Sequence, residues 1–155
     1  MKIIREFVNE YAFLSNYGPC YVTYQGVTYL SAEAAYHSAK FKSKKDKALF
    51  EFLSADASKQ LAKKMKDKIR LDWNLVKEQI MYNIVYKKFT QNSELRMKLI
   101  DTRDDFLIEG NYWEDHFWGV CPKEGNIPED GQNILGQILM KVRAELKYKE
   151  AQNNG

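Results

Sequence analysis

Four side chains with useful chemistry recur at helical spacing near the start of the chain. They stand at i, i+3, i+4 and i+7, so a helix would carry all of them on one face: Glu33, Tyr36, His37 and Lys40. A carboxyl and an amine on one face can exchange protons with a substrate, and the amine can also attack an electrophilic carbon. Ordinary surface helices also pair Glu with Lys, so the spacing alone does not select catalysis. Alanines and a phenylalanine fill the other positions, which predicts that this helix is packed.

A second group of chemically useful residues lies in later parts of the chain. Asp115 precedes Trp118 by three positions, and Trp73 stands directly after Asp72. Indole rings usually pack in a core, but an accessible indole can stack on a purine or pyrimidine ring. Asn133 precedes the last helical segment, where unpaired N–H groups could receive an anion, and capping explains this asparagine equally well.

Several reaction classes lack their characteristic residues. His37 and His116 form no HExxH pattern, and Cys20 and Cys121 stand far apart, so we predict no metal site. No GxSxG, GxxxxGKS/T or GxGxxG motif is present, which argues against serine hydrolases, nucleoside triphosphatases and dinucleotide enzymes, and we predict no cofactor. The spaced cysteines are typical of reduced thiols in a cytoplasmic protein. No apolar segment approaches the roughly 20 residues that cross a bilayer, so we expect no membrane association.

Charge is distributed unevenly along a chain whose formal net charge is only +3. Residues 40–70 hold eleven basic and four acidic residues, whereas residues 101–131 hold two basic and nine acidic ones. A basic surface can hold a phosphate, and an acidic one can supply carboxylates to a reaction. Ordinary solvated surfaces show the same pattern, so charge alone does not favour an enzyme.

The elements that must position these residues indicate an α+β fold. The 155 residues include enough large apolar side chains for a core without disulfides. β-branched and aromatic residues predict strands over 2–8, 20–24 and 27–29 in a small antiparallel sheet, with a turn at Gln25-Gly26. Periodicity and capping predict helices over 31–42, 46–53, 56 or 58 to 65, 72–89, 93–100 and 133–149, a strand over 106–108 and a loop over 110–131. We expect one compact, helix-dominated α+β domain over residues 1–150 and a frayed tail over 151–155.

Short motifs follow one another in order along nearly the whole chain: Phe13-Leu14-Ser15-Asn16, Glu33-x-x-Tyr36-x-x-x-Lys40-Phe41, Ala62-Lys63-Lys64, Arg70-x-Asp72-Trp73, Asp115-x-x-Trp118-Gly119 and Gly131-x-Asn133-x-Leu135-Gly136. Together they resemble the motifs of the NADAR superfamily, of which the YbiA-like N-glycosidases are compact members. The chain departs from that pattern at Ala34 and His37, where the family often has His and Gln, and a usual Gly-Arg pair is missing after Lys64.

The resemblance implies a NADAR fold and an N-glycosyl hydrolase that cleaves the C1–N bond of a phosphorylated or ADP-linked ribose. It implies two substrate groups, the pyrimidine ribosylamine phosphates of riboflavin synthesis and ADP-ribose on guanine in nucleic acid. Carried over by position, it makes Glu33 the catalytic acid/base, Lys40 its partner and Asp115 the second carboxylate. The substrate-binding residues would be Tyr36, Trp73, Trp118, Asn16, Arg70 and Asn133.

Two mechanisms and two other functions remain open at this point. Glu33 can protonate the leaving base while Asp115 supports the oxocarbenium-like sugar or orients water. Alternatively, a neutral Lys40 amine attacks C1 of the ring-opened sugar and forms a Schiff base that water resolves. A non-catalytic module that binds ADP-ribose or a nucleotide would use the same aromatic residues, and the lysines could instead hold nucleic acid. The sequence makes no prediction of an oligomeric state.

Overall fold

The computed structural model describes residues 1–122 and 130–155, and the contacts of the chain cluster in two compact units. One unit joins Met1–Ser15 to Arg96–Gly155, and the other spans Asn16–Leu95. Part of the loop predicted over 110–131 lies outside the described residues.

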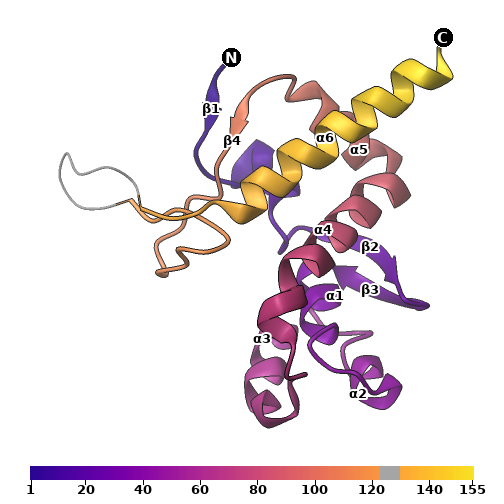
Figure 1. The fold of residues 1–155 in the computed structure, drawn as a ribbon, viewed down its shortest axis with the longest axis vertical. Coiled ribbons are helices and arrows are strands. Elements are labelled where there is room, and N and C mark those ends of the chain that lie inside the picture. The colour runs from indigo at the N-terminus through magenta and orange to yellow at the C-terminus, as the bar shows by residue number, and fades with distance from the viewer. Residues whose placement is uncertain (123–129) are drawn as a thin grey trace. The chain divides into compact units, whose positions relative to one another are not determined.

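The unit of residues 16–95 combines a hairpin with helices, and its helix α1 contacts β3, α3 and α4 (Figure 1). Buried alanines on α1 allow these close approaches. The elements are β2 (Pro19–Tyr24), β3 (Val27–Ser31), α1 (Ala32–Ser38), α2 (Lys44–Ala48), α3 (Ala55–Lys64), the 3-10 turn η2 (Lys66–Lys68) and α4 (Trp73–Gln91). The helices α3 and α4 fall close to the predicted ranges, whereas α2 starts and ends earlier than the predicted 46–53, and the sequence does not predict η2.

The β2–β3 hairpin confirms the predicted antiparallel pairing and its turn. Gln25 and Gly26 both have positive φ angles, 51° and 82°, as a tight two-residue hairpin turn requires. Val22 pairs with Tyr29, and both side chains are buried on the same face of the hairpin. Ser31 is the last residue of β3 and also the N-cap of α1, so the end of the hairpin determines where the helix starts.

Helix α1 is shorter than the predicted range of 31–42 and ends at Ser38. The chain continues as a tightened turn, in which Lys40 N donates to His37 O and Phe41 N donates to Ser38 O. Phe41 is fully buried and stacks on Phe50 at a centroid distance of 5.5 Å. This packing draws the chain inward after Ser38, and Lys40 still lies one turn beyond Tyr36.

In the other unit, the prediction that a strand over residues 2–8 joins the antiparallel sheet was wrong. Strand β1 (Ile3–Ile4) is short and pairs in parallel with β4 (Phe106–Leu107), apart from the β2–β3 hairpin. The pattern of side chains indicates that a segment can form a strand. It does not indicate which strand pairs with that segment when the partner lies about 100 residues further on. The 3-10 helix η1 (Asn9–Leu14) follows β1, and α5 (Ser93–Asp101) leads into β4.

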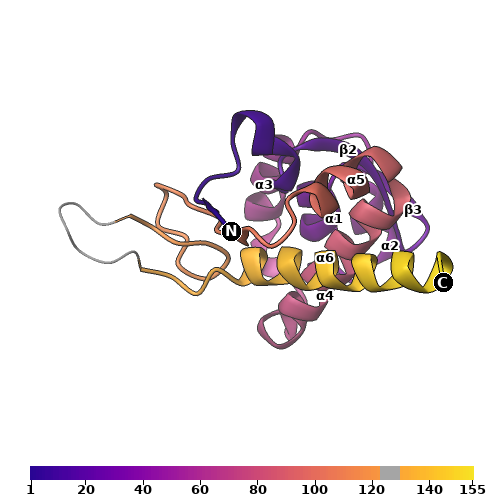
Figure 2. The ribbon, with the colours of Figure 1, turned by 90° about the horizontal axis from the view of Figure 1, so that it is seen from above.

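Helix α6 (Ile134–Asn153) packs its apolar face on β4 and is one continuous helix in both views (Figures 1 and 2). Leu135, Leu139 and Val142 are buried along this face. Arg143 is also buried, and its guanidinium donates to Thr102 Oγ1 at 2.8 Å and to Asp105 O at 2.9 Å. The helix extends beyond the predicted end at residue 149, and fraying of residues 151–155 stays a prediction.

The predicted helix-dominated α+β class is confirmed by this element order. Among residues 1–122 and 130–155, no helix has the length and apolar character needed to span a bilayer. Cys20 and Cys121 are both free thiols.

Candidate active site

Three members of the predicted catalytic stripe lie on α1 and Lys40 follows its end, and two hydrogen bonds fix the start of the helix. Ser31 Oγ accepts the N–H of Ala34 at 3.1 Å and caps the helix. The N–H of Glu33 donates to the backbone carbonyl of Asn16 at 3.0 Å. These two hydrogen bonds fix the first turn of α1, in which Glu33 lies.

Glu33 and His37 form a close pair one turn apart on α1. The distance between Glu33 Oε1 and His37 Nε2 is 2.8 Å, and the side chains are only 14% and 7% exposed. Burial is the largest influence on the imidazole and lowers the pKa of His37, against the Glu33 hydrogen bond and charge, which raise it. Lys40 and Lys59 lower it further. The ring is thus a neutral hydrogen-bonding partner of the carboxyl group near neutral pH.

Lys40 lies in the same neighbourhood, above two aromatic rings. Its Nζ is 5.4 Å from the ring centroid of Tyr36 and 5.9 Å from that of Trp73. Burial is the largest cause that lowers the pKa of Lys40, and the charge of Glu33 opposes it. Repulsion from Lys77 and Lys59 lowers it as well. The amine is therefore easier to deprotonate than an exposed lysine.

Tyr36 and Trp73 form the aromatic part of this site. Their ring centroids are 5.1 Å apart with an interplanar angle of 54°, and both side chains are largely buried. Trp73 is the first residue of α4, which contacts α1. The structure thus brings together four of the predicted site residues: Glu33, Tyr36, Lys40 and Trp73.

Arg70 and Asn16, the other predicted contacts in this unit, already have protein partners. The backbone N–H of Arg70 donates to Lys40 O at 2.8 Å, which ties this segment to the stripe. Its guanidinium binds Asp72 in a bidentate pair at 2.6 and 2.9 Å, so Asp72 does not cap α4 as predicted. Asn16 is buried, and its Nδ2 donates to Met81 Sδ at 3.3 Å.

Asp115 and Trp118 belong to the other unit, where Asp115 organises a turn. Asp115 Oδ1 accepts the N–H groups of Phe117 at 3.1 Å and of Trp118 at 2.9 Å. The fully buried Asn111 fixes the backbone of Asp115 by two further hydrogen bonds. Gly119 completes the motif, because a Cβ atom there would collide with the backbone oxygen of Glu109. Trp118 is half-buried, with its ring edge-on to Phe117.

Asn133 has a structural role in the same unit. It adopts a left-handed conformation with φ of 53°, accepts the N–H of Glu109 at 3.0 Å and donates to Leu107 O at 2.9 Å. The sequence leaves anion binding and capping both open at this helix start. The Asn133 side chain makes no cap hydrogen bond, and the first two N–H groups of α6 already have backbone acceptors. Ile134 N donates to Phe117 O, and Leu135 N donates to Trp118 O.

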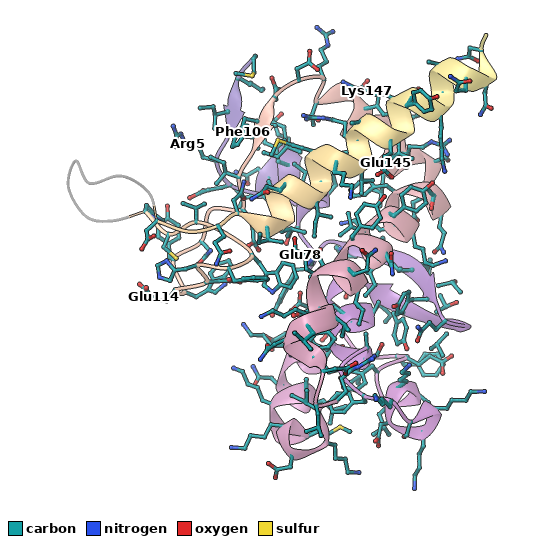
Figure 3. The ribbon with its side chains drawn as sticks, viewed as in Figure 1. Arg5, Glu78, Phe106, Glu114, Glu145 and Lys147 are labelled. Atoms are coloured by element: carbon teal, nitrogen blue, oxygen red, sulfur yellow. The ribbon has the colours of Figure 1, made fainter. Side chains whose placement is uncertain are left out.

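A group of possible metal ligands lies beside this turn, although the sequence predicts no metal site. Donor atoms of Glu114, His116 and Cys121 lie within 4.8 Å of one another. His116 Nε2 is 2.8 Å from Glu114 Oε2, and Cys121 Sγ donates to Asn111 Oδ1 at 3.2 Å. Glu114 is exposed at the edge of the loop, facing away from α6 (Figure 3). Each group therefore has a partner within the protein, and the arrangement by itself identifies no ion.

Two participants in the α1 site were missed by sequence reasoning. His37 stands on the predicted stripe but received no role, since spacing alone does not show which stripe members touch. Lys59, on α3, contributes charge to both His37 and Lys40, and no local pattern distinguishes it from the neighbouring lysines. A hollow in the other unit is lined by Arg5, Glu6 and Tyr112 among others, and it contains none of the predicted site residues.

The fold and these motifs define a family. The NADAR domain matches residues 4–147, and the chain belongs to that family, as the motif resemblance indicated. Several of its relatives are named N-glycosidases, and the chain is an N-glycosidase of this family.

Particular relatives support this assignment over most of the chain. N-glycosidase Npun_R5314 of Nostoc punctiforme is 34% identical over 141 residues, which cover 88% of this chain and 86% of the relative. Riboflavin biosynthesis protein VVA0006 of Vibrio vulnificus is 35% identical over 140 residues, which cover 89% of this chain but only 36% of that longer protein. The NMR structure of Escherichia coli YbiA matches with a TM-score of 0.82 at 27% identity, covering 97% of this chain and 88% of YbiA.

Proposed function

We propose that this N-glycosidase hydrolyses the C1–N bond of a small ribose phosphate carrying a pyrimidine-type amine, with Glu33 and Lys40 at the reacting carbon. The observation that carries the proposal is the α1 site itself. A largely buried carboxyl group on α1 and a part-buried amine on the turn after α1 share one site, with the amine above the Tyr36 and Trp73 rings. These are the groups that cleavage of a sugar–nitrogen bond needs.

Cleavage builds positive charge on the ribose ring and negative charge on the departing nitrogen. In the direct route, Glu33 delivers a proton to that nitrogen while a carboxylate supports the sugar or orients water, which is the role that the sequence predicts for Asp115. In the covalent route, the neutral Lys40 amine attacks C1 of the ring-opened sugar and the pyrimidine amine of the substrate leaves. Water then hydrolyses the Schiff base between Lys40 and the sugar. The lowered pKa of Lys40 supports the second route, because it raises the share of the nucleophilic amine.

The substrate class follows from charge and from one relative. The charges of Lys59 and Lys77 repel the Lys40 ammonium, and an anionic group relieves such repulsion, which supports a phosphate on the substrate. The Vibrio vulnificus relative is named a riboflavin biosynthesis protein, which supports pyrimidine ribosylamine phosphates over other ribosides. ADP-ribose on guanine in nucleic acid is the other substrate group, and the Tyr36 ring would contact the base in either case.

Release of free base tests the proposal. Purified protein is incubated with an aminopyrimidine ribosylamine phosphate and, separately, with ADP-ribosylated guanine in DNA, and free products are followed by chromatography. We expect base and ribose 5-phosphate from the first substrate. Glu33→Gln should abolish release while its circular dichroism stays unchanged, and Glu78→Gln, an exposed carboxylate on α4, should retain it. Release from the second substrate alone would overturn the substrate class, and full activity of Glu33→Gln would remove Glu33 from the chemistry.

A further inference from the structure

His37 is the one member of the α1 stripe that the proposed function leaves without a task. Its Nε2 atom lies 2.8 Å from Glu33 Oε1, and both side chains are shielded from water. Its ring is packed edge-on against Tyr36 with centroids 5.3 Å apart. The orientation of the imidazole is thus fixed by packing on one side and by the carboxyl group on the other.

The second ring nitrogen reveals which atom carries the hydrogen. His37 Nδ1 is buried and has no hydrogen-bond partner among the residues that the structure describes. A neutral imidazole has one N–H donor and one bare acceptor nitrogen. A buried N–H without an acceptor is rarer and costlier than an acceptor without a donor. The hydrogen therefore belongs on Nε2, where Glu33 Oε1 accepts it.

The charges around His37 agree with a neutral ring. Burial, the Lys40 charge on the segment after α1 and the Lys59 charge on α3 all lower the pKa of His37, whereas Glu33 raises it. The net direction is downward from the ordinary value of 6.5. Near pH 7.5 the imidazole is uncharged, and its Nε2–H donates the hydrogen bond that Glu33 Oε1 accepts.

We propose that His37 is a positioning residue whose Nε2–H holds Glu33 as an oriented carboxylate, so that Glu33 acts first as a base in each turnover. The inference rests on the proposed function and deepens it. In the hydrolytic step Glu33 takes a proton from the attacking water, the oxygen of that water bonds to C1, and the C1–N bond breaks. The proton then passes from Glu33 to the departing nitrogen, and His37 keeps its own hydrogen throughout.

The tautomer of His37 can be measured directly, because the chain has only two histidines. A His116→Asn variant leaves a single imidazole, and long-range ¹H–¹⁵N correlation spectra of ¹⁵N-histidine-labelled protein distinguish the two neutral tautomers from the imidazolium. We expect the Nε2–H tautomer at pH 7.5, and imidazolium only below pH 6.5, the ordinary histidine value. An Nδ1–H tautomer, or imidazolium persisting at pH 7.5, would overturn the inference.

Two variants test the consequence for turnover. His37→Gln retains an N–H donor, and we expect its kcat to stay within about threefold of the parent protein. His37→Leu has no donor, and we expect kcat to fall about tenfold or more with KM nearly unchanged. The acid limb of its pH profile should move to higher pH, because an unsupported carboxylate holds a proton more readily.

The outcomes separate this inference from the proposed function. If His37→Leu matches the parent protein in kcat and pH profile while the parent releases base, the positioning role is wrong and the glycosidase assignment stands. If the parent releases no base from any ribosyl substrate, the proposed function fails, and the tautomer measurement still decides the geometry. Should His37→Leu fail to fold, His37→Gln and the tautomer together decide: the inference requires near-normal kcat in His37→Gln and falls without it.

Discussion

At the scale of single residues, the amine of Lys40 is subject to opposing influences. Burial and the charges of Lys59 and Lys77 favour the neutral amine, and Glu33 favours the ammonium ion. The rings of Tyr36 and Trp73 also favour the cation, since a cation within about 6 Å of an aromatic face is attracted to it. The net direction of the Lys40 pKa is downward. A small substrate that excludes water from this amine would push the balance further toward a nucleophile.

We expect sodium borohydride, added during turnover, to trap a covalent adduct with the mass of the sugar on Lys40, because hydride reduces a Schiff base to a stable amine. Peptide mass spectrometry locates the adduct. Lys40→Met should abolish trapping, and Lys42→Met, which removes an exposed lysine two residues away, should not. Repeated absence of an adduct while product accumulates would assign the reaction to direct hydrolysis.

Trp118 provides a second test at this scale. If its half-buried indole stacks on the substrate base, Trp118→Phe should weaken substrate binding by roughly 1–3 kcal/mol, the range typical of base–aromatic stacking. Trp113 lies in the same segment with 64% of its surface exposed, and Trp113→Phe should leave binding unchanged. Calorimetric titration of an unreactive substrate analogue measures both. Equal effects in the two variants would return Trp118 to a packing role.

At the scale of elements, the sequence predicts short-range features correctly and long-range ones poorly. The helix start at residue 31 and the Gln25-Gly26 turn follow from residue types, since both depend on neighbours within four positions. The end of α1 was placed too late, because it depends on Phe41 packing against Phe50. The parallel partner of β1 and the charge of Lys59 near the site come from distant parts of the chain, and no pattern in a single sequence reports them.

The cap of α1 links helix stability to catalysis. Ser31→Ala should lower the free energy of unfolding by about 1 kcal/mol, the usual cost of losing such a cap, and should also reduce kcat/KM, because Glu33 lies in the first turn. Ser43 Oγ caps α2 in the same way, accepting the N–H of Asp46 at 3.0 Å, and α2 carries no proposed site residue. Urea unfolding and steady-state assays compare the variants. We expect Ser43→Ala to keep full kcat/KM. Loss of activity in both variants would mean that the effect of Ser31→Ala does not arise from the position of Glu33 in α1.

At the scale of the whole molecule, Lys88 makes global stability depend on pH. Its side chain is 1% exposed on α4, and burial lowers its pKa to about 8, against a small opposing effect of Cys20. The folded protein therefore releases this proton at lower pH than the unfolded chain, whose value is the ordinary 10.5. Between these values the unfolded chain binds more protons, so the free energy of unfolding rises with pH in this window.

We expect the free energy of unfolding to rise by roughly 2 kcal/mol between pH 8 and pH 10 through Lys88. Denaturant titrations at the two pH values measure the change, and Lys88→Met should reduce it by about that amount. Lys87→Met, which removes the neighbouring half-buried lysine, is the control for loss of a lysine from this helix. An unchanged pH dependence in Lys88→Met would mean that Lys88 keeps its charge inside the fold. The raised pKa values of Cys20 and Cys121 act in the opposite direction from the ordinary thiol value of 9.0 upward, and those of Tyr24 and Tyr29 do so above pH 10, so the difference between parent and variant is what isolates Lys88.

The side chain of Asn133 has a consequence for how the molecule avoids its own copies. One edge of β4 is taken by β1, and the Asn133 amide offers the other edge one acceptor and one donor, at Glu109 N and Leu107 O. The Asn133 amide thus makes the two hydrogen bonds that a third strand would otherwise make with Glu109 N and Leu107 O. An exposed strand edge is where chains join into aggregates. With Glu109 N and Leu107 O occupied by a side chain, this edge of β4 no longer offers these groups to a neighbouring chain.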